Sequence, residues 1–466
     1  MNTTHSDSDG AAQYLKMTGT PIPRLITALA VPTIVSMLTT GIYNLADTYF
    51  VSCLHSDSAT GAVGIVFSLM ALIQAIGFTL GMGSGSLISR LLGQQKKAAA
   101  DRVLSSGFAA ALVCGTLITI LGLFFLDPLM ALLGATDTIL PYARDYAQYI
   151  LFGAPVMTAS FVLNAVLRSA GHATLSMVGI TVGGALNLIL DPIFIFGLNL
   201  GIAGAAIATV LSQCVSFLIL LTCFLTGKSI LRLSPRYVAL RPVQYGHIIR
   251  AGMPSFFRQG LASVATVALN VAAMSYGDAA VAGMSVVGRV FMLILSVLIG
   301  FGQGFQPVIG YNYGAQRWDR VRQSFFFTLV TGSLMMAVLS VGGWFAAPLV
   351  IRQFGTTAAM LEIGIYAMRA QCVGLLFQPL GVVCNMTFQS IGKSWLATFL
   401  SACRQGIFFL PLILILPRVI GLRGVEITQP LADFCTFLTC IPFMIYFLWM
   451  LTAKAGASGD RPQAEL

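Results

Sequence analysis

Long apolar stretches follow one another along this chain almost from end to end, and only short polar segments separate them. A helix needs about 20 predominantly apolar residues to cross the hydrocarbon core of a bilayer. Charged residues make up only 9% of the chain, whereas soluble globular proteins carry about 25%. Because the apolar stretches leave no room for a sizeable soluble domain, the sequence predicts an all-α integral membrane protein.

The apolar runs and the breaks between them predict twelve transmembrane helices. An even number of spans places both chain termini on one side of the membrane. The predicted spans cover residues 25–53, 60–87, 101–126, 146–170, 174–197, 203–226, 250–275, 281–305, 323–347, 365–388, 394–417 and 428–452.

The distribution of Lys and Arg predicts which side holds the termini. Most of the 26 basic residues lie in the terminal tails or in connections on the same side, and only Arg144, Arg352, Arg418 and Arg423 lie in the opposite connections. Basic residues concentrate in cytoplasmic loops. We therefore expect a multi-pass protein of the cell (inner) membrane with cytoplasmic termini. The net charge of +10 follows from this topology and gives no reason to expect nucleic-acid binding.

The two halves of the chain repeat each other. One offset of 221 residues places N-x4-S-x-G-x3-L, which begins at Asn164, on the same pattern at Asn385, and it also aligns Gly81, Gly83, Gly93 and Gln95 with Gly302, Gly304, Gly314 and Gln316. Parallel repeats of this kind are related by an axis along the membrane normal and hold the substrate between them. The predicted parts are a cytoplasmic tail (1–24), an N-lobe (25–226), a linker (227–249), a C-lobe (250–452) and a second tail (453–466).

Two carboxylates lie deep in the apolar spans of the first half. Asp47 is late in span one and Asp191 late in span five, and Asn187 shares a helical face with Asp191 because the two are four residues apart. A charge at bilayer depth costs roughly 2.5 to 3.5 kcal/mol on insertion scales and usually faces a water-filled cavity or a polar partner. These residues are therefore expected to have a function.

Two further polar residues are expected at the same depth. Thr209 is early in span six, and a helical hairpin centred near Leu175 would bring Asn164 level with Asn187. The repeat offset puts Ala268, Phe408, Leu412 and Pro430 in the places of Asp47, Asn187, Asp191 and Thr209. We therefore predict an ion-coupling site in the first half only, formed by Asp47, Asn164, Asn187, Asp191 and Thr209.

The chemistry of this site leaves two coupling ions open. Oxygens of Asp47, Asn187, Asp191 and Thr209 could bind Na⁺, or one carboxylate could take up a proton. The alternative without ion coupling is that Asp191 caps a helix break and that Asp47 lies at the membrane surface. No cofactor and no catalytic group is expected, because the nine cysteines form no CxxC pair and have no His at metal-ligand spacing.

Pro32 lies inside span one, 15 residues before Asp47. A proline removes a backbone hydrogen bond and clashes with the preceding turn, so we predict a hinge that links ion binding to cavity shape; a static kink is the alternative. Elsewhere, Arg258 and Arg404 are expected to extend toward the membrane surface, and Asp433 to lie at the outer surface.

Several segments carry a family resemblance. They are P-x14-D from Pro32 to Asp47, LGMGSGSLISRLLGQQKKAAADRV, LNAVLRSAGHATLSM, NLILDPIFIFGLNLGIAGAAIATVLSQ, GQGFQPVIGYNYGAQ and GLRGVEITQPLADF. In this order and spacing they resemble the multidrug and toxic compound extrusion (MATE) transporters. FRQ in span seven and CRQGIFFLP in span eleven are most similar to the bacterial drug-exporting branch.

The resemblance implies a V-shaped pair of six-helix lobes that exports organic, often cationic, compounds in exchange for Na⁺ or H⁺ by alternating access. By motif, Asp47, Asn164, Asn187, Asp191 and Thr209 match the N-lobe cation and proton site of the family, and Pro32 matches its span-one bend. Span seven has no carboxylate where some members carry a glutamate, so a second-lobe Na⁺ site is not expected.

The sequence thus predicts a cation-coupled multidrug exporter that acts on small organic molecules, works in the lipid bilayer as a monomer and is not an enzyme. One alternative is a lipid-linked oligosaccharide flippase of the same superfamily, against which the scattered intramembrane arginines argue. Another is a membrane-embedded enzyme, against which the histidines argue, because all four lie at or outside span ends.

Overall fold

The computed structural model describes residues 3–54, 57–354 and 357–457, and all regular structure in these ranges is helical. Helices suit apolar sequence in lipid because they satisfy each backbone N–H and C=O within the segment. In the N-terminal half they are α1 (Thr3–Gly19), α2 (Ile22–Ser52), α3 (Asp57–Gly93), α4 (Lys97–Phe124), α5 (Leu126–Leu132), α6 (Leu140–Ser169), α7 (Ala173–Pro192), the π-helical η1 (Ile193–Gly197) and α8 (Gly201–Leu225).

A short 3-10 helix, η2 (Pro235–Tyr237), lies in the connection to the C-terminal half. The helices that follow are α9 (Pro242–Met274), α10 (Asp278–Gly314), α11 (Trp318–Arg352), α12 (Ala358–Leu375), α13 (Gln378–Ser390), α14 (Ser394–Ala402), the π-helical η3 (Cys403–Phe409), α15 (Leu410–Ile420) and α16 (Leu422–Ala457). The predicted linker, residues 227–249, thus includes the first turns of α9.

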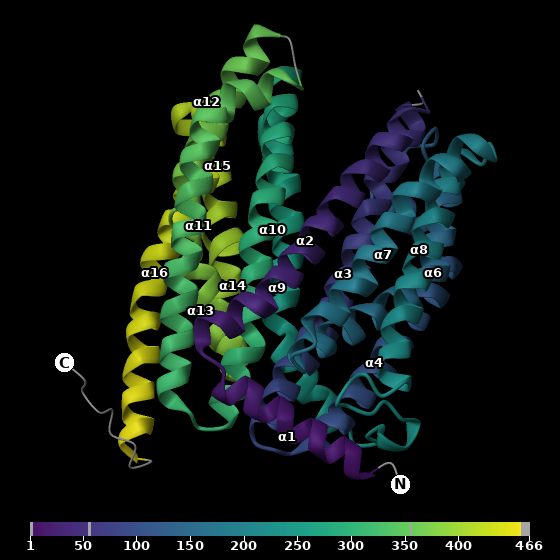
Figure 1. Cartoon of the computed structure of the whole chain (residues 1–466). Helices are drawn as coiled ribbons and strands as arrows, with labels where there is room; N and C mark the ends of the chain where they lie inside the picture. The colour runs from purple at the N-terminus through teal and green to yellow at the C-terminus, as the bar shows by residue number, and fades with distance from the viewer. Residues whose placement is uncertain (1–2, 55–56, 355–356, 458–466) are drawn as a thin grey trace.

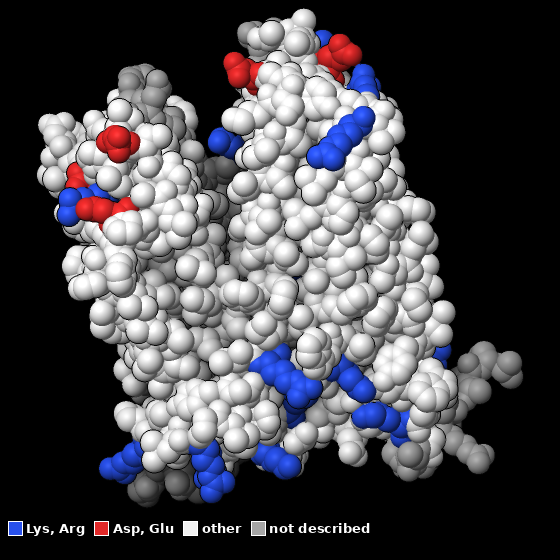
Figure 2. Space-filling view, turned by 180° about the vertical axis from the view of Figure 1, so that it is seen from behind, with Lys and Arg blue, Asp and Glu red and all other residues white. Residues whose placement is uncertain are grey.

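These helices form two bundles that meet at one end and diverge toward the other (Figure 1). The N-terminal lobe holds α2 to α8, and the C-terminal lobe holds α9 to α16. The main contacts between the lobes are those of α2 with α10 and of α3 with α9 and α10. The closed end, where both termini lie, is called the base here. Away from the base the surface is hollowed between the lobes, and this hollow is called the cleft (Figure 2).

The described helices account for the predicted spans. Ten of them are long and apolar enough to cross a membrane, and the bent pair α12 and α13 adds an eleventh. The remaining long helix, α9, has 33 residues and carries Arg250 and Arg258. It packs against α3, α10 and α14. The all-α architecture with two lobes is therefore confirmed.

Basic side chains gather around the base, and several acidic side chains lie near the opposite end (Figure 2). This is the distribution that the sequence pattern predicts for a protein whose base faces the cytoplasm.

The base is closed by a contact that repeats itself under the 221-residue offset. A Cβ atom at Gly93 would overlap the carbonyl oxygen of Tyr311, and a Cβ atom at Gly314 would overlap the carbonyl oxygen of Arg90. Gly314 is the counterpart of Gly93, and Tyr311 is the counterpart of Arg90. Because only glycine lacks a Cβ, α3 and α10 can approach this closely at both places.

The N-terminal helix α1, in the region predicted as a polar tail, lies across the base (Figure 1). Gln13 Nε2 donates a hydrogen bond of 3.0 Å to the carbonyl of Ala170 in the N-terminal lobe. Asn312 Nδ2, on α10 of the C-terminal lobe, donates one of 3.2 Å to the carbonyl of Met17. The Met17 side chain is fully buried. The helix therefore contacts both lobes.

Candidate ion-binding site

The polar centre of the N-terminal lobe is built on α7 and α8. Asn187 and Asp191 lie one helical turn apart near the end of α7 that is away from the base. Asn187 Nδ2 donates a hydrogen bond of 3.0 Å to Asp191 Oδ1, and Thr209 Oγ1 on α8 lies 3.4 Å from the same nitrogen. All three side chains are buried. The helical spacing thus brings together the amide, carboxylate and hydroxyl predicted from the sequence.

Asp47 on α2 joins this centre through Tyr146 on α6. The Tyr146 hydroxyl donates a hydrogen bond of 3.3 Å to Asp47 Oδ2, and the tyrosine is fully buried. Tyr146 also lies close to Asp191 and Thr209. It therefore stands between the two carboxylates. Tyr146 was not predicted as part of the site, because a tyrosine at the start of a span is usually an interfacial aromatic residue.

Several oxygens of this centre lack a partner. Asp47 Oδ1, Asn187 Oδ1 and Asp191 Oδ2 are buried and accept no hydrogen bond from the described chain. Neither carboxylate forms an ion pair with a described Lys, Arg or His. Unpaired buried acceptors are costly unless something binds them. Two carboxylates, an amide oxygen and a hydroxyl are ligands that suit Na⁺, and either carboxylate can instead take up a proton.

Asn164 lies apart from these four residues. Its Nδ2 donates a hydrogen bond of 2.6 Å to Ser176 Oγ across the turn between α6 and α7. Its repeat counterpart Asn385 makes the same kind of contact, with Nδ2 bonded to the carbonyl of Ala397 at 2.6 Å and to Ser401 Oγ at 2.7 Å. The shared sequence pattern thus corresponds to a shared hydrogen bond between neighbouring helices.

Pro32 lies where the N-terminal lobe touches the C-terminal lobe. On α2 it stands between Ala30 and Ile34, whose backbones closely approach Gly304 and Gly300 of α10. Asp47 lies 15 residues further along the same helix, or about 22 Å at the α-helical rise. A bend at Pro32 would therefore move the Asp47 end of α2 relative to the C-terminal lobe.

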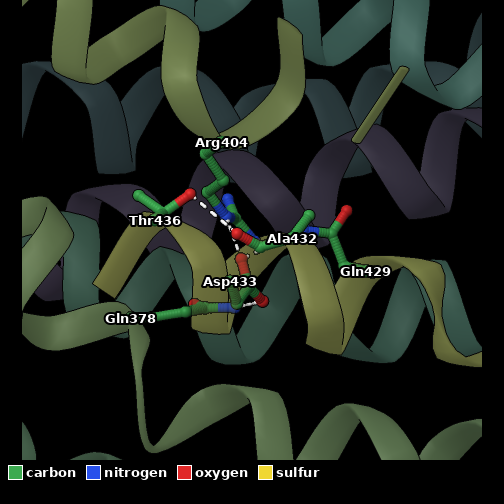
Figure 3. Close-up of polar contacts among 6 residues, drawn as sticks. All are labelled: Gln378, Arg404, Gln429, Ala432, Asp433 and Thr436. Atoms are coloured by element: carbon green, nitrogen blue, oxygen red, sulfur yellow. Dashed lines mark hydrogen bonds and ion pairs between the residues drawn. The ribbon is translucent and has the colours of Figure 1, made fainter. Parts of the chain in front are cut away.

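The C-terminal lobe contains a different polar centre, around Asp433 of α16 (Figure 3). Arg404 Nε, on η3, donates to Asp433 Oδ1 at 2.6 Å, and Gln429 Nε2 donates to the same oxygen at 3.1 Å. Gln378 Nε2, at the start of α13, donates to Asp433 Oδ2 at 2.9 Å. Asp433 is only 2% exposed. The expectation that it lies at the membrane surface is therefore wrong.

The expectation for Arg404 is wrong as well, because its guanidinium turns inward to Asp433. The sequence contained one signal for this ion pair, since Arg404 and Asp433 carry opposite charges on consecutive spans. Counting residues outward from the turn at Gly421 places the two at different depths in the membrane, so their pairing was not predicted. The length of the arginine side chain closes this difference.

Comparison with known proteins places the chain among transporters. A family model described as MatE matches it twice, over residues 32–193 and 254–415. The multidrug export protein MepA of Staphylococcus haemolyticus (strain JCSC1435) is 26% identical over 420 residues, which cover 90% of this chain and 92% of that protein. One match of the family model falls in each lobe, in agreement with the predicted repeat.

Two solved structures have the same fold. The outward-facing conformation of a multidrug resistance MATE family transporter of the MOP superfamily superposes with a TM-score of 0.89 at 28% identity, covering 95% of this chain and 98% of that one. A MATE crystal structure in the bent conformation superposes with a TM-score of 0.87 at 27% identity, covering 96% and 99%.

Proposed function

The chain belongs to the MatE family, and from that premise we propose that it exports organic, often cationic, compounds across the membrane in exchange for Na⁺ or H⁺. It is a transporter and not an enzyme. We place it in the cytoplasmic membrane, where it would work as a monomer. The base and both termini would lie in the cytoplasm, because the basic side chains gather at that end. The cleft would then open to the outside.

The observation that carries this proposal is the pair of uncompensated carboxylates in the N-terminal lobe. Asp47, Asn187, Asp191 and Thr209 would hold the coupling ion, with three buried oxygens free to bind it. Asn164 would support the site by holding α6 against α7. Drug and ion must favour different states of the transporter, because linkage between two ligands is reciprocal.

Pro32 would serve as the hinge between ion binding and lobe movement. Its neighbours on α2 touch α10, so a change of bend there alters the angle between the Asp47 region and the C-terminal lobe. Protonation or ligation of Asp47 would then favour one angle of the cleft over the other.

The test is ethidium efflux from cells or vesicles under separately imposed pH and Na⁺ gradients. Wild type should export, and Asp47→Asn and Asp191→Asn should insert normally but fail. Asp127→Asn is the matched control, because Asp127 is about half exposed and forms an ion pair with Arg144 at the surface. The gradient that drives wild-type efflux identifies the ion.

Two results would contradict the proposal in different ways. If the Asp47 and Asp191 variants export as well as wild type, the carboxylates do not couple transport. If wild type exports no ethidium or similar dye, the lipid-linked oligosaccharide flippase becomes the better assignment.

A further inference from the structure

A second charged centre lies between the lobes, and the ion-coupling site does not include it. Arg168, in the last turn of α6, is 3% exposed. Its Nη1 donates to Gln303 Oε1 on α10, in the opposite lobe, and its Nη2 lies 3.7 Å from the Met82 sulfur on α3. Gln303 lies eleven residues before the end of α10 at the base, about 16 Å at the helical rise. The Arg168 guanidinium therefore lies well inside the molecule, where α3 and α6 of the N-terminal lobe meet α10 of the C-terminal lobe.

Arg258 of α9 brings a second guanidinium to the same place. It is partly exposed, and its Nη1 lies 3.5 Å from Asn385 Oδ1. The amide nitrogen of Asn385 is already bonded to Ala397 and Ser401, so its oxygen is held toward the arginine. Met386, the chain neighbour of Asn385, packs against Gly302, the chain neighbour of Gln303. The partners of the two guanidinium groups are therefore close together, and the two like charges repel each other.

Neither arginine has an anionic partner among the described residues. The ion pairs there involve only Arg144, Arg404 and Arg423. The contacts of Arg168 and Arg258 are instead amide oxygens and a thioether. Buried charges in proteins are normally paired, and two like charges side by side raise the cost further. An anion placed between them would remove this cost.

The repeat indicates that the fold does not require these charges. The counterpart of Arg168 is Gln389, and the counterpart of Arg258 is Met37. Gln389 fills its place with neutral hydrogen bonds, donating to the Ala251 carbonyl at 3.2 Å and to Ser255 Oγ at 3.0 Å. A neutral side chain can therefore occupy the position of Arg168 in a folded lobe.

We infer that Arg168 and Arg258 form an anion-binding site between the lobes that takes the carboxylate of an exported compound. A guanidinium fork matches a carboxylate in shape and charge. The inference rests on the proposed export function and assigns the recognition of a free acid to two residues outside the ion-coupling site. A lipid phosphate has the same chemistry, and the experiment separates the two sources.

The test uses rhodamine B, which has a free carboxylate, and its ethyl ester, which keeps the same cationic ring system. Uptake is measured in proteoliposomes of phosphatidylcholine under the gradient that drives ethidium transport. Wild type should transport both dyes. Arg258→Gln and Arg168→Gln should lower rhodamine B transport about tenfold relative to the ester, as expected for the loss of a charge-assisted hydrogen bond. Arg258→Lys should recover part of the loss.

Arg418→Gln is the control, because Arg418 is exposed at the end of α15 away from the base. It should leave the ratio of the two dyes unchanged. The ester also reports folding: variants that lose both dyes equally would overturn the inference and make the arginines structural. Unchanged transport of both dyes by the Gln variants would overturn it as well, and so would a wild type that moves the ester but not rhodamine B.

A second arm adds 30% phosphatidylglycerol to the vesicles. If the anionic lipid changes ester transport by wild type but not by Arg258→Gln, the site binds a lipid phosphate and the carboxylate assignment is wrong. If wild type transports neither ester nor ethidium, the failure lies in the proposed export function itself.

Discussion

The two lobes share one fold but treat a buried carboxylate in opposite ways. In the N-terminal lobe, Asp191 receives one hydrogen bond from Asn187, and its second oxygen has no partner in the described chain. In the C-terminal lobe, Asp433 receives hydrogen bonds from Arg404, Gln429 and Gln378.

This difference distinguishes a carboxylate that stabilises the fold from one that is free to bind an ion. A carboxylate that already has a guanidinium and two amides gains little from binding an ion, because its charge is neutralised within the lobe. A carboxylate without such partners gains much, because binding removes a large desolvation cost. We therefore propose ion binding for the N-terminal lobe alone. The C-terminal lobe uses its buried carboxylate for packing, at a position that the 221-residue offset matches to Ser212 and not to Asp191.

The strongest test of this contrast compares stability with transport. Asp433→Ala leaves Arg404 largely buried without its anion and should cost about 3 kcal/mol. Asp191→Asn removes an unpaired charge and should be neutral or stabilising. Thermal unfolding of the purified proteins in detergent measures both effects. Equal destabilisation by the two changes would remove the distinction between the lobes.

The second prediction concerns the base, where Gly93 and Gly314 make equivalent contacts in the two lobes. Gly93→Ala and Gly314→Ala each push a Cβ into a backbone carbonyl of the other lobe, and each should cost about 1 to 3 kcal/mol. Gly342→Ala on α11 meets open space and should be slightly stabilising, as expected for Gly to Ala in a helix. The melting temperatures of the three variants check this. Markedly unequal effects at Gly93 and Gly314 would mean that the base is not symmetric in energy.

The smallest expected effects concern the two asparagines. Asn164→Ala and Asn385→Ala each remove a buried hydrogen bond between neighbouring helices and should cost about 1 kcal/mol, by similar amounts. Ethidium efflux then tells whether Asn164 also serves ion coupling. If it does, Asn164→Ala loses efflux while Asn385→Ala retains it. If both variants retain the same efflux, Asn164 serves only the contact between α6 and α7.

Sequence periodicity and the repeat predicted those parts of the molecule that depend on position along one helix. Asn187 and Asp191 share a face because they are four residues apart, and Asn164 and Asn385 have equivalent contacts because the offset relates them. Such spacing does not determine which face of a helix packs against each neighbouring helix. For this reason the spacing predicted only that Asn164 is level with Asn187, and it did not predict that the Asn164 amide bonds to Ser176.

The same limit explains what the sequence missed. Tyr146 reaches Asp47 only because α6 turns that side chain into the lobe. Arg404 reaches Asp433 because η3 and α16 face each other. Both contacts depend on how each helix is rotated about its axis relative to its neighbours, and residue spacing in a single sequence does not specify that rotation.

The paired glycine contact at the base has two-fold symmetry. Gly93 meets Tyr311 as Gly314 meets Arg90, so exchanging the halves reproduces the contact. An interface that maps onto itself in this way is isologous, the form that two identical subunits adopt around a two-fold axis. One six-helix chain could make the same contact with a second copy of itself. The base therefore has, inside a single polypeptide, the geometry of a homodimer interface.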